Sequence, residues 1–353
     1  MKKTIKQIAD LAGVSRGTVD RVLHNRYGVN PVVRNRVKKI ADDIGYRPNT
    51  VAKALKCSEK SIHFGFITTD MNNPFWHGIV KGFRCVEKEY ESHGVRLKQI
   101  DMKEISASEQ VRCLDELLNC EEKISGVFIG GINSSVITDY INQIADRIPV
   151  ITYNTDVKNS KRLCFVGQNH FEAGNVAGRL MSQLLQRDGK IATFAGTSKT
   201  LAHLERFNGF KESMEKLSPN SIILSPMPHI ETDEAAYHAA VQALNIPDIT
   251  ALYVTGEGSV GVARALKESK KRPEVKMICY DMLDGVIDAI KNEIIDITIG
   301  QKEFIQGYLP VKLMYEYLTF GTMPPSEKIY TDIDIRVKEN IDYRDFDIRY
   351  PVP

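Results

Sequence analysis

The stretch Thr4-Ile-Lys-Gln-Ile-Ala-Asp-Leu-Ala-Gly-Val-Ser15 decides the fold of the N-terminal part of this chain. Its apolar spacing predicts one short helix over residues 5–11 and a second over residues 16–23, joined by a tight turn at 12–15. Two helices at such a turn bury a few apolar side chains between them. The residues expected in this small core are Ile8, Leu11, Val14, Val19 and Val22.

Signals for the start and end of helices support this interpretation. Thr4 and the glutamine three residues later make a capping box, and Ser15 can cap the second helix. Gly13 stands where a tight corner between helices needs a residue without a side chain. A third helix is expected to begin at Asn30, with Pro31 in its first turn, and to end near the next glycine. Together these features predict a helix-turn-helix unit with a third helix packed on it.

The distribution of charge indicates that this N-terminal part binds a polyanion. Residues 1–60 contain 14 Lys and Arg against 5 Asp and Glu, a net charge of +9. The remaining residues contain 33 against 40, a net charge of −7, so the whole chain has only +2. One basic end on an otherwise acidic protein is the electrostatic footprint of a phosphate-binding module.

These residues resemble the lactose-repressor (LacI) family of bacterial transcription regulators. The matching features are the 4–15 stretch, Thr18 and Val19, residues 21–23, then Gly-Tyr-Arg-Pro-Asn at 45–49 and Val-Ala-Lys-Ala-Leu at 51–55. They occur in the family's order and spacing, and the resemblance covers nearly the whole chain. It implies an N-terminal all-α helix-turn-helix DNA-binding domain and an α/β, two-lobed, periplasmic-binding-protein-like (type I) sensor domain.

The resemblance also implies the domain boundaries. In chain order we expect the DNA-binding domain over 1–47, a hinge helix and linker over 48–61, and an effector-binding domain over 62–353. The expected extent of lobe one is about 62–155 plus 300–322, and that of lobe two is about 156–299 plus 323–345.

A recognition helix presents its first residues to base edges in the major groove. Here those residues are Arg16, Gly17 and Asp20, with Arg21 one turn along. Arg16 and Arg21 are the candidate base readers, because arginine contacts guanine through two hydrogen bonds, although either could contact phosphate alone. Gly17 has no side chain to reach a base, so one operator position is expected to be weakly specified. Asp20 stands where the family commonly has serine, which leaves the operator sequence open.

Small polar residues at helix starts and loops form a second set of candidate DNA contacts, because they can reach phosphate oxygens or simply cap helices. They are Thr4, Ser15, Thr18, Asn25 and Asn30. The resemblance adds Tyr46, Asn49 and Ala52, and implies that Leu55 enters the minor groove as an apolar wedge. The alternative for Leu55 is a buried contact with the sensor domain. A hinge helix this short is expected to order only when two copies pack together on DNA.

From residue 62 onward, short apolar runs alternate with longer amphipathic stretches. This alternation predicts doubly wound α/β architecture, and its length fits two sheets. The expected strands lie at 63–68, 126–130, 149–153, 190–195, 251–255 and 276–280. The expected helices lie at 76–91, 108–119, 136–145, 172–186, 205–217, 233–244 and 260–268. Ligands of such folds bind outside the carboxyl ends of the strands.

Polar and aromatic residues gather at these strand ends and suit a sugar, because planar polar groups bind hydroxyls while an aromatic ring stacks on the sugar's apolar face. Resemblance to ribose-type periplasmic binding proteins implies ligand contact for Asn73, Phe75, Trp76, Asn154, Arg206, Asp281 and Gln301. The strand ends add Asp156, Thr255 and Glu257 as candidates. Asn154-Thr155 and Thr255-Gly256 differ from the residues of the ribose binders, so ribose itself is not expected.

Simpler roles stay open for several of these residues. Phe75 and Trp76 could belong to the core, and Arg206 could form a surface pair with its neighbour Glu205. Four scattered histidines are assigned no role: His77, His170, His203 and His229.

Other classes of function fit the residues less well. An enzyme is not expected, because the chain has no Gly-rich phosphate loop, no G-x-S-x-G motif and no metal cluster. A transport receptor would share the cleft but has no use for a basic helix-turn-helix. A regulator with a purine or another non-sugar effector stays open, because aromatic rings also stack on bases. Arg206 equally leaves open an acidic or phosphorylated sugar.

The remaining sequence features bear on location and assembly. No 18-residue apolar stretch occurs, and no apolar segment follows Lys2 and Lys3, so neither a membrane span nor a secretory signal is expected. The six cysteines lack metal-binding spacing, which indicates a cytoplasmic protein without metal or cofactor, although Cys57 could serve as a redox switch. The stretch 343–353 is short and has no heptads, so we expect a homodimer and no tetramerising helix. The expected DNA partner of such a dimer is a pseudo-palindromic operator. The sequence leaves open whether the effector weakens or strengthens DNA binding. Repression of transcription is expected only because most members of the resembled family are repressors.

Overall fold

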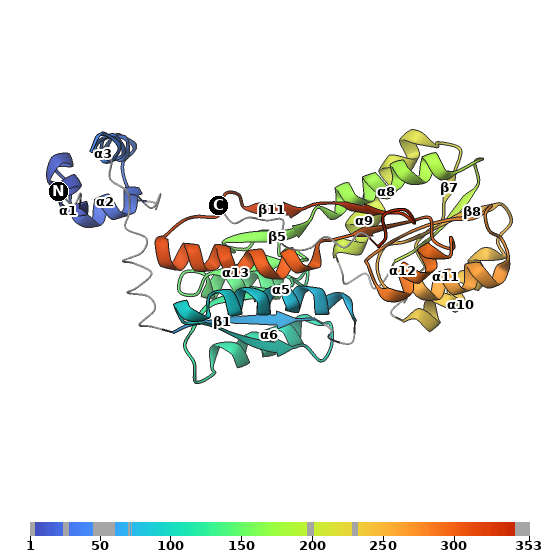
Figure 1. Ribbon diagram of the computed structural model, residues 1–353, viewed down its shortest axis with the longest axis horizontal. Coiled ribbons are helices and arrows are strands. Elements are labelled where there is room, and N and C mark those ends of the chain that lie inside the picture. Colours follow the sequence, from blue (N-terminus) through green and yellow to red (C-terminus); the bar gives the residue numbers. More distant parts are fainter. Residues whose placement is uncertain are drawn as a thin grey trace.

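The computed structural model describes residues 4–23, 28–44, 61–69, 71, 73–195, 201–227 and 232–342. A small three-helix unit lies at one end of the molecule, and two larger α/β lobes follow it (Figure 1). Among the described residues, no helix is long and apolar enough to cross a membrane.

The three-helix unit begins with the two predicted helices of the helix-turn-helix. Its elements are α1 (Ile5–Ala12), α2 (Arg16–Leu23) and α3 (Pro31–Asp43). The Gln7 backbone N–H donates to Thr4 Oγ1 over 3.3 Å, as the capping box predicts. Gly13 has a φ of 63°, in the left-handed region that favours glycine. The corner between α1 and α2 therefore has the predicted geometry.

The core of this unit differs from the prediction at one position. Ile8, Val19 and Val22 are fully buried, and Val37 from α3 joins them. Leu11 is 58% exposed, so its predicted place in the core is wrong. The buried face of α1 is formed by Ile8, Ala9 and Ala12, and the 100° step between successive helix residues turns Leu11 away from that face.

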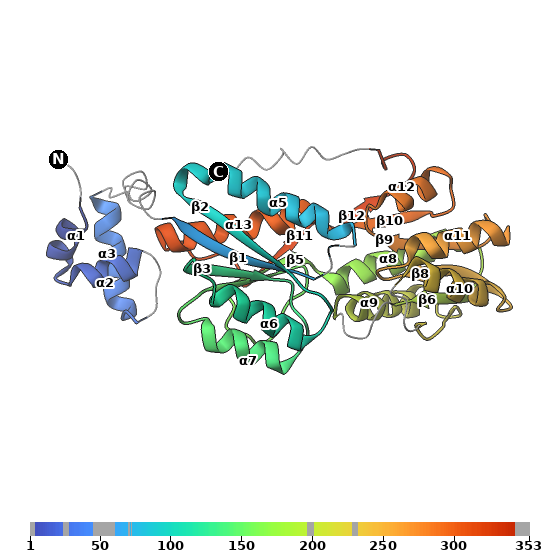
Figure 2. The ribbon, with the colours of Figure 1, turned by 90° about the horizontal axis from the view of Figure 1, so that it is seen from below.

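Lobe one contains a six-stranded parallel sheet with the order β11-β5-β4-β3-β1-β2. Its strands are β1 (Ile62–Thr68), β2 (Val95–Asp101), β3 (Ile124–Ile129), β4 (Val150–Tyr153), β5 (Cys164–Gln168) and β11 (Lys328–Thr331). The helices are α5 (Phe75–Glu89), η1 (Glu91–His93), α6 (Ala107–Leu118), α7 (Ser135–Ile144) and α13 (Glu303–Phe320). Helices α5 and α13 cover one face of the sheet, and α6 and α7 cover the other (Figure 2).

Lobe two repeats this architecture with the strand order β12-β10-β9-β8-β6-β7. Its strands are β6 (Lys190–Phe194), β7 (Ile222–Ile223), β8 (Ile249–Val254), β9 (Lys276–Tyr280), β10 (Ile297–Gly300) and the antiparallel β12 (Asp334–Arg336). The helices α8 (His170–Leu184) and α9 (Leu201–Leu217) pack on one face. The other face carries α10 (Asp233–Leu244), α11 (Ser259–Ser269) and α12 (Asp284–Lys291).

The chain passes between the lobes three times, after β5, β10 and β11. Two predicted lobe boundaries are therefore wrong, because β5 was expected in lobe two and the segment containing β11 was also expected there. The reason is pairing between distant segments: β5 lies between β4 and β11 in one parallel ladder, which local periodicity cannot reveal. Gln168 Nε2 joins all three crossings, because it donates to Gly300 O (3.0 Å) and Asp332 O (3.3 Å).

Candidate functional site

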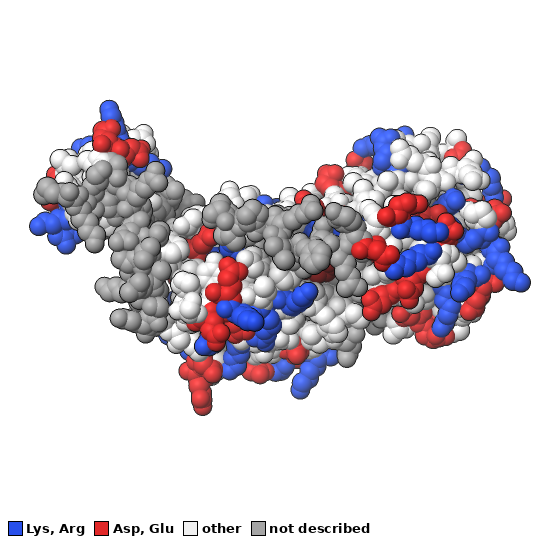
Figure 3. Space-filling view, in the orientation of Figure 1, with Lys and Arg blue, Asp and Glu red and all other residues white. Residues whose placement is uncertain are grey.

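The first candidate site is the exposed face of α2. Arg16, Gly17 and Arg21 are exposed, whereas Val19 and Val22 point into the core. The described residues of the three-helix unit carry seven Lys and Arg against four Asp and Glu. In Figure 3 the visible face of the two lobes instead mixes both signs of charge. This amphipathic placement leaves the two candidate base-reading arginines accessible.

The other predicted DNA contacts divide into two groups. Ser15 caps α2 by accepting from the Thr18 N–H (3.1 Å), and Asn30 caps α3 by accepting from the Val32 N–H (2.9 Å). Thr4, Ser15 and Asn30 are exposed, and Thr18 and Asp20 are half-buried. Asn25, Tyr46, Asn49, Ala52 and Leu55 lie outside the described residues, as does Cys57.

The second candidate site is a cleft between the lobes, at the carboxyl ends of the strands. Eight of the ten predicted effector residues line it: Asn73, Phe75, Trp76, Asn154, Arg206, Glu257, Asp281 and Gln301. Thr155 and Gly256, which the sequence placed at strand ends without a ligand role, also line it. Lining residues that the sequence did not indicate are Thr69, Ile105, Gly130, Gly131, Ile132, Ala202 and His203. The glycines among the lining residues leave room for neighbouring side chains, as Gly130 does for Trp76 and Gly256 does for His203.

The lobe-one wall is built around the start of α5. Asn73 accepts a hydrogen bond from the Phe75 N–H (3.0 Å), which orients this first turn. Trp76 packs edge to face against Phe75 and Tyr153, with ring centroids 5.6 and 6.1 Å apart. Gly130 faces the indole so closely that an added Cβ would lie 3.2 Å from Trp76 Cη2. Trp76 therefore belongs both to the core of lobe one and to the cleft wall.

The lobe-two wall centres on a buried guanidinium. Arg206 is 2% exposed, donates to Thr255 O (2.7 Å) and lies 3.9 Å above the Tyr280 ring. Among the described residues, its Nε has no hydrogen-bond partner. Burial raises the pKa of the Asp281 carboxyl, while Arg206 and the hydrogen bond from Gln301 Nε2 act in the opposite direction. A buried charged group that lacks some of its hydrogen bonds costs free energy. A polar ligand that supplies these hydrogen bonds would therefore be stabilised at this wall.

Strand-end backbone geometry turns two of these side chains into the cleft. Asn154 follows β4 with a φ of 59°, and Asp281 follows β9 with a φ of 74°. Asn and Asp tolerate this left-handed conformation better than other residues that carry side chains. The carboxamide of Asn154 also donates to Gln306 Oε1 (3.2 Å), which ties β4 to α13.

His203 is the main residue that the sequence analysis missed. It lies one helical turn before Arg206 on α9, and this spacing was the available signal. Burial, and to a smaller degree Arg206, lowers the pKa of His203 to about 3, so its ring is neutral at neutral pH. His203 Nε2 lies 3.6 Å from Glu257 Oε2. Gly256 makes space for the ring, because a Cβ there would lie 2.2 Å from the same nitrogen.

Two predicted effector residues do not line the cleft. Thr255 is fully buried, and its hydroxyl donates to Phe194 O (3.4 Å). Asp156 accepts from Arg162 Nε (2.5 Å) and from the Thr152 hydroxyl (2.8 Å). Both were expected because they follow a strand, but their side chains point into structural contacts. Among the described residues, no group of three or more His, Cys, Asp and Glu is placed to hold a metal ion.

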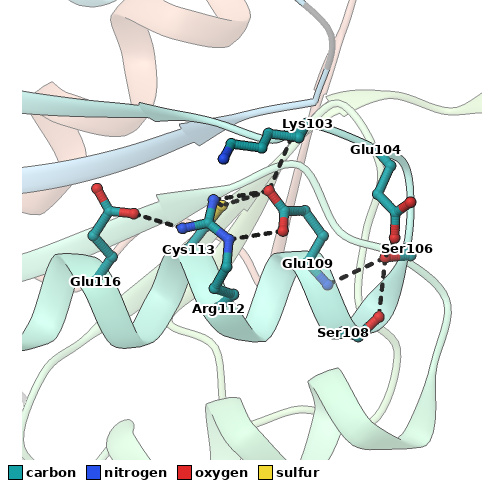
Figure 4. Close-up of polar contacts among 8 residues, drawn as sticks. All are labelled: Lys103, Glu104, Ser106, Ser108, Glu109, Arg112, Cys113 and Glu116. Atoms are coloured by element: carbon teal, nitrogen blue, oxygen red, sulfur yellow. Dashed lines mark hydrogen bonds and ion pairs between the residues drawn. The ribbon is translucent and has the colours of Figure 1, made fainter.

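Figure 4 shows the polar contacts at the start of α6, next to the loop whose Ile105 lines the cleft. Glu109 accepts from the Lys103 N–H (3.0 Å) and from Arg112 Nε (2.7 Å), which holds the loop that carries Ile105. These bonds keep the pKa of Glu109 low, at about 2. Gln110 on the same turn is fully buried; it donates to Gly130 O (2.8 Å) and accepts from the Ile132 N–H (3.2 Å).

Comparison with known proteins identifies both parts of the chain. The family described as "Bacterial regulatory proteins, lacI family" matches residues 4–49, and the family described as "Periplasmic binding protein domain" matches residues 64–322. The chain belongs to the lacI family of bacterial regulatory proteins. This regulator is 23% identical to catabolite control protein A of Staphylococcus aureus over 352 residues, 98% of this chain and 99% of that protein. It is a DNA-binding transcriptional regulator with a periplasmic-binding-protein-like sensor domain.

Solved structures confirm the fold class of the sensor domain. A glucose-galactose binding protein from Geobacillus stearothermophilus has a TM-score of 0.72 and 24% identity, and covers 80% of this regulator and 99% of its own chain. An arabinose binding protein from the same organism has a TM-score of 0.67 and 25% identity, with 80% and 99% covered. The two-lobed α/β architecture predicted from the sequence is therefore confirmed.

Proposed function

We propose that this regulator binds operator DNA as a homodimer and that a sugar, bound between the lobes, controls its affinity for DNA. The observation that carries the proposal is the division of the cleft. Phe75 and Trp76 form an aromatic wall on lobe one, and Arg206, Asp281 and Gln301 form a polar wall on lobe two. A pyranose or furanose ring has one apolar face and an edge of hydroxyl groups, so it matches such a cleft.

The unsatisfied atoms of the polar wall support a ligand rich in hydroxyl groups. Arg206 Nε is a donor and Gln301 Oε1 is an acceptor, and both are buried without a partner in the part of the chain that the structure describes. A hydroxyl group donates and accepts at the same time, so neighbouring sugar hydroxyls can satisfy both atoms. Two proteins of similar structure, a glucose-galactose and an arabinose binding protein, bind ligands of this class.

The proposed DNA function depends on the exposed face of α2. Arg16 and Arg21 would read bases, while Ser15, Thr18 and Asn30 would contact phosphates of a pseudo-palindromic operator in the cytoplasm. Closure of the lobes on the sugar would change the spacing of the two DNA-binding units in the dimer, and with it the affinity for DNA. This function requires no catalytic residue.

Trp76 provides the test, because it is the single tryptophan of the chain. Its fluorescence would be followed during titration with D-glucose, D-galactose, L-arabinose, D-glucuronate, glucose 6-phosphate, adenine and guanine. We expect a saturable change with at least one neutral sugar. We also expect that sugar to alter affinity for an operator selected by the full-length protein from random duplex DNA. A response to purines alone would overturn the sugar proposal and keep the regulator.

A further inference from the structure

A second pocket adjoins the effector cleft and shares the lining residues Thr155 and Ala202 with it. Lobe one contributes Phe165 on β5 and Tyr330 on β11, which form an edge-to-face ring pair with centroids 6.4 Å apart. Lobe two contributes the starts of α8 and α9. Residues of both lobes therefore enclose this pocket, just as they enclose the cleft.

Two buried side chains that line this pocket each keep an acceptor that has no partner among the described residues. Gln168 is 1% exposed and uses its Nε2 for the hinge carbonyls, which leaves Oε1 unpaired. His170 is 4% exposed, and its Nε2 lies 2.9 Å from Asn154 O. A carbonyl oxygen only accepts, so Nε2 carries the proton. Burial, and to a smaller degree Arg206, lowers the pKa of His170 to about 3, so the unpaired Nδ1 has no proton and can only accept.

Ion pairs neutralise most of the charge around the second pocket. Asp156 pairs with Arg162 (2.5 Å), and Lys158 of lobe one pairs with Glu205 of lobe two (2.7 Å). The remaining charged lining residue, Lys328, is exposed at the rim. The buried part of the pocket thus offers two neutral acceptors and aromatic surface, which favours an uncharged ligand with hydroxyl donors.

We propose that the second pocket is a subsite for the second ring of a disaccharide-sized effector, whose hydroxyl groups donate to Gln168 Oε1 and His170 Nδ1. This proposal rests on the proposed function, because the first ring occupies the cleft. Thr155 and Ala202 line both spaces and have small side chains, so we expect the short glycosidic link to pass beside them.

Calorimetric titration of the full-length regulator tests the subsite. Maltose, cellobiose and lactose would each be compared with D-glucose and D-galactose. We expect one disaccharide to bind at least tenfold more tightly than its constituent monosaccharides, at one molecule per protomer. Leu201 is among the residues that line the second pocket and is not among those that line the cleft, so Leu201→Trp should fill the second pocket. This variant should remove the gain for the disaccharide and leave the affinity for the monosaccharide unchanged.

A second variant isolates the acceptor at His170. His170→Gln keeps an amide donor near the position of Nε2 and removes Nδ1, so disaccharide affinity should fall about tenfold, as expected for one lost buried hydrogen bond. Exposed His238→Gln on α10 is the matched control and should change nothing.

The outcomes separate this proposal from the sugar proposal. If monosaccharides bind but no disaccharide gains affinity, or if Leu201→Trp leaves the gain intact, the subsite is overturned while the sugar effector stands. Two monosaccharide molecules bound per protomer would also overturn a linked second ring. Binding of no sugar would overturn both proposals.

Discussion

At the scale of single residues, Arg206 carries the largest share of the expected effector affinity. Its guanidinium is 2% exposed and still has an unpaired Nε. Arg206→Met should raise the effector Kd about 100-fold, because charge-assisted hydrogen bonds contribute roughly 1.5–3 kcal/mol each. Trp76 fluorescence measures the Kd, and thermal unfolding checks that the variant is folded. Arg187→Met, at an exposed position, is the control and should keep the affinity. An unchanged Kd in Arg206→Met would place the effector away from this guanidinium.

The buried histidines predict a pH dependence of stability. Burial lowers the pKa values of His170 and His203 to about 3, below the ordinary 6.5. Above pH 6.5 both histidines are neutral in the folded and the unfolded chain, so they do not lower the free energy of unfolding. As the pH falls from 6.5 toward 3 the unfolded chain binds protons that the folded chain does not, so the free energy of unfolding decreases. At pH 5 the loss is about 2 kcal/mol per histidine.

Urea unfolding between pH 5 and 8 measures this dependence. The difference in unfolding free energy between the wild-type chain and a His170→Gln/His203→Gln variant should shrink as the pH falls, because only the wild-type chain carries the two histidines. A difference that stays constant over this range would contradict the lowered pKa values.

The predictions of individual cleft residues differed from the structure where the direction of a side chain decided its contacts. The position of a residue in the sequence does not give that direction. Asp156 and Thr255 follow strands as effector residues should, but both make structural hydrogen bonds and neither lines the cleft, although Asp156 lines the second pocket. His203 looked isolated in the sequence, yet α9 places it on the same face as Arg206. Periodicity locates a helix or a strand end, but partners from other segments decide what each side chain contacts.

At the scale of elements, helix α6 positions the backbone of residues 130–132, which line the cleft. Gln110 is fully buried and satisfies Gly130 O and the Ile132 N–H. Gln110→Leu should cost roughly 2–5 kcal/mol of unfolding free energy, because it leaves two buried backbone groups without partners. It should also weaken effector binding. Urea unfolding and Trp76 fluorescence measure the two effects, and Gln143→Leu on the exposed face of α7 is the control. Equal stability of the two variants would exclude this supporting role.

The helices and strands that the sequence analysis did not predict each lack a strong local pattern of apolar residues, for a physical reason. β2 lies at the edge of its sheet, where Arg96 and Lys98 are tolerated, so it lacks an apolar run. α13 contains Pro310 and is apolar on most of its surface, so it shows neither helical periodicity nor an uninterrupted helix signal. The central strands and amphipathic helices were predictable because each has one strong local pattern. The placement of β5 and β11 depends on pairing across the whole chain.

At the scale of the whole molecule, the Lys158–Glu205 ion pair joins the two lobes beside the cleft. Lys158 is 50% exposed and Glu205 26%, so solvent screens the pair and its contribution is modest. Lys158→Glu should place two carboxylates together, favour the open arrangement and raise the effector Kd about two- to fivefold at low salt. Lys158→Glu/Glu205→Lys should restore the affinity, and the effect should shrink in 1 M salt. If the double variant binds as weakly as the single one, the pair does not hold the lobes closed.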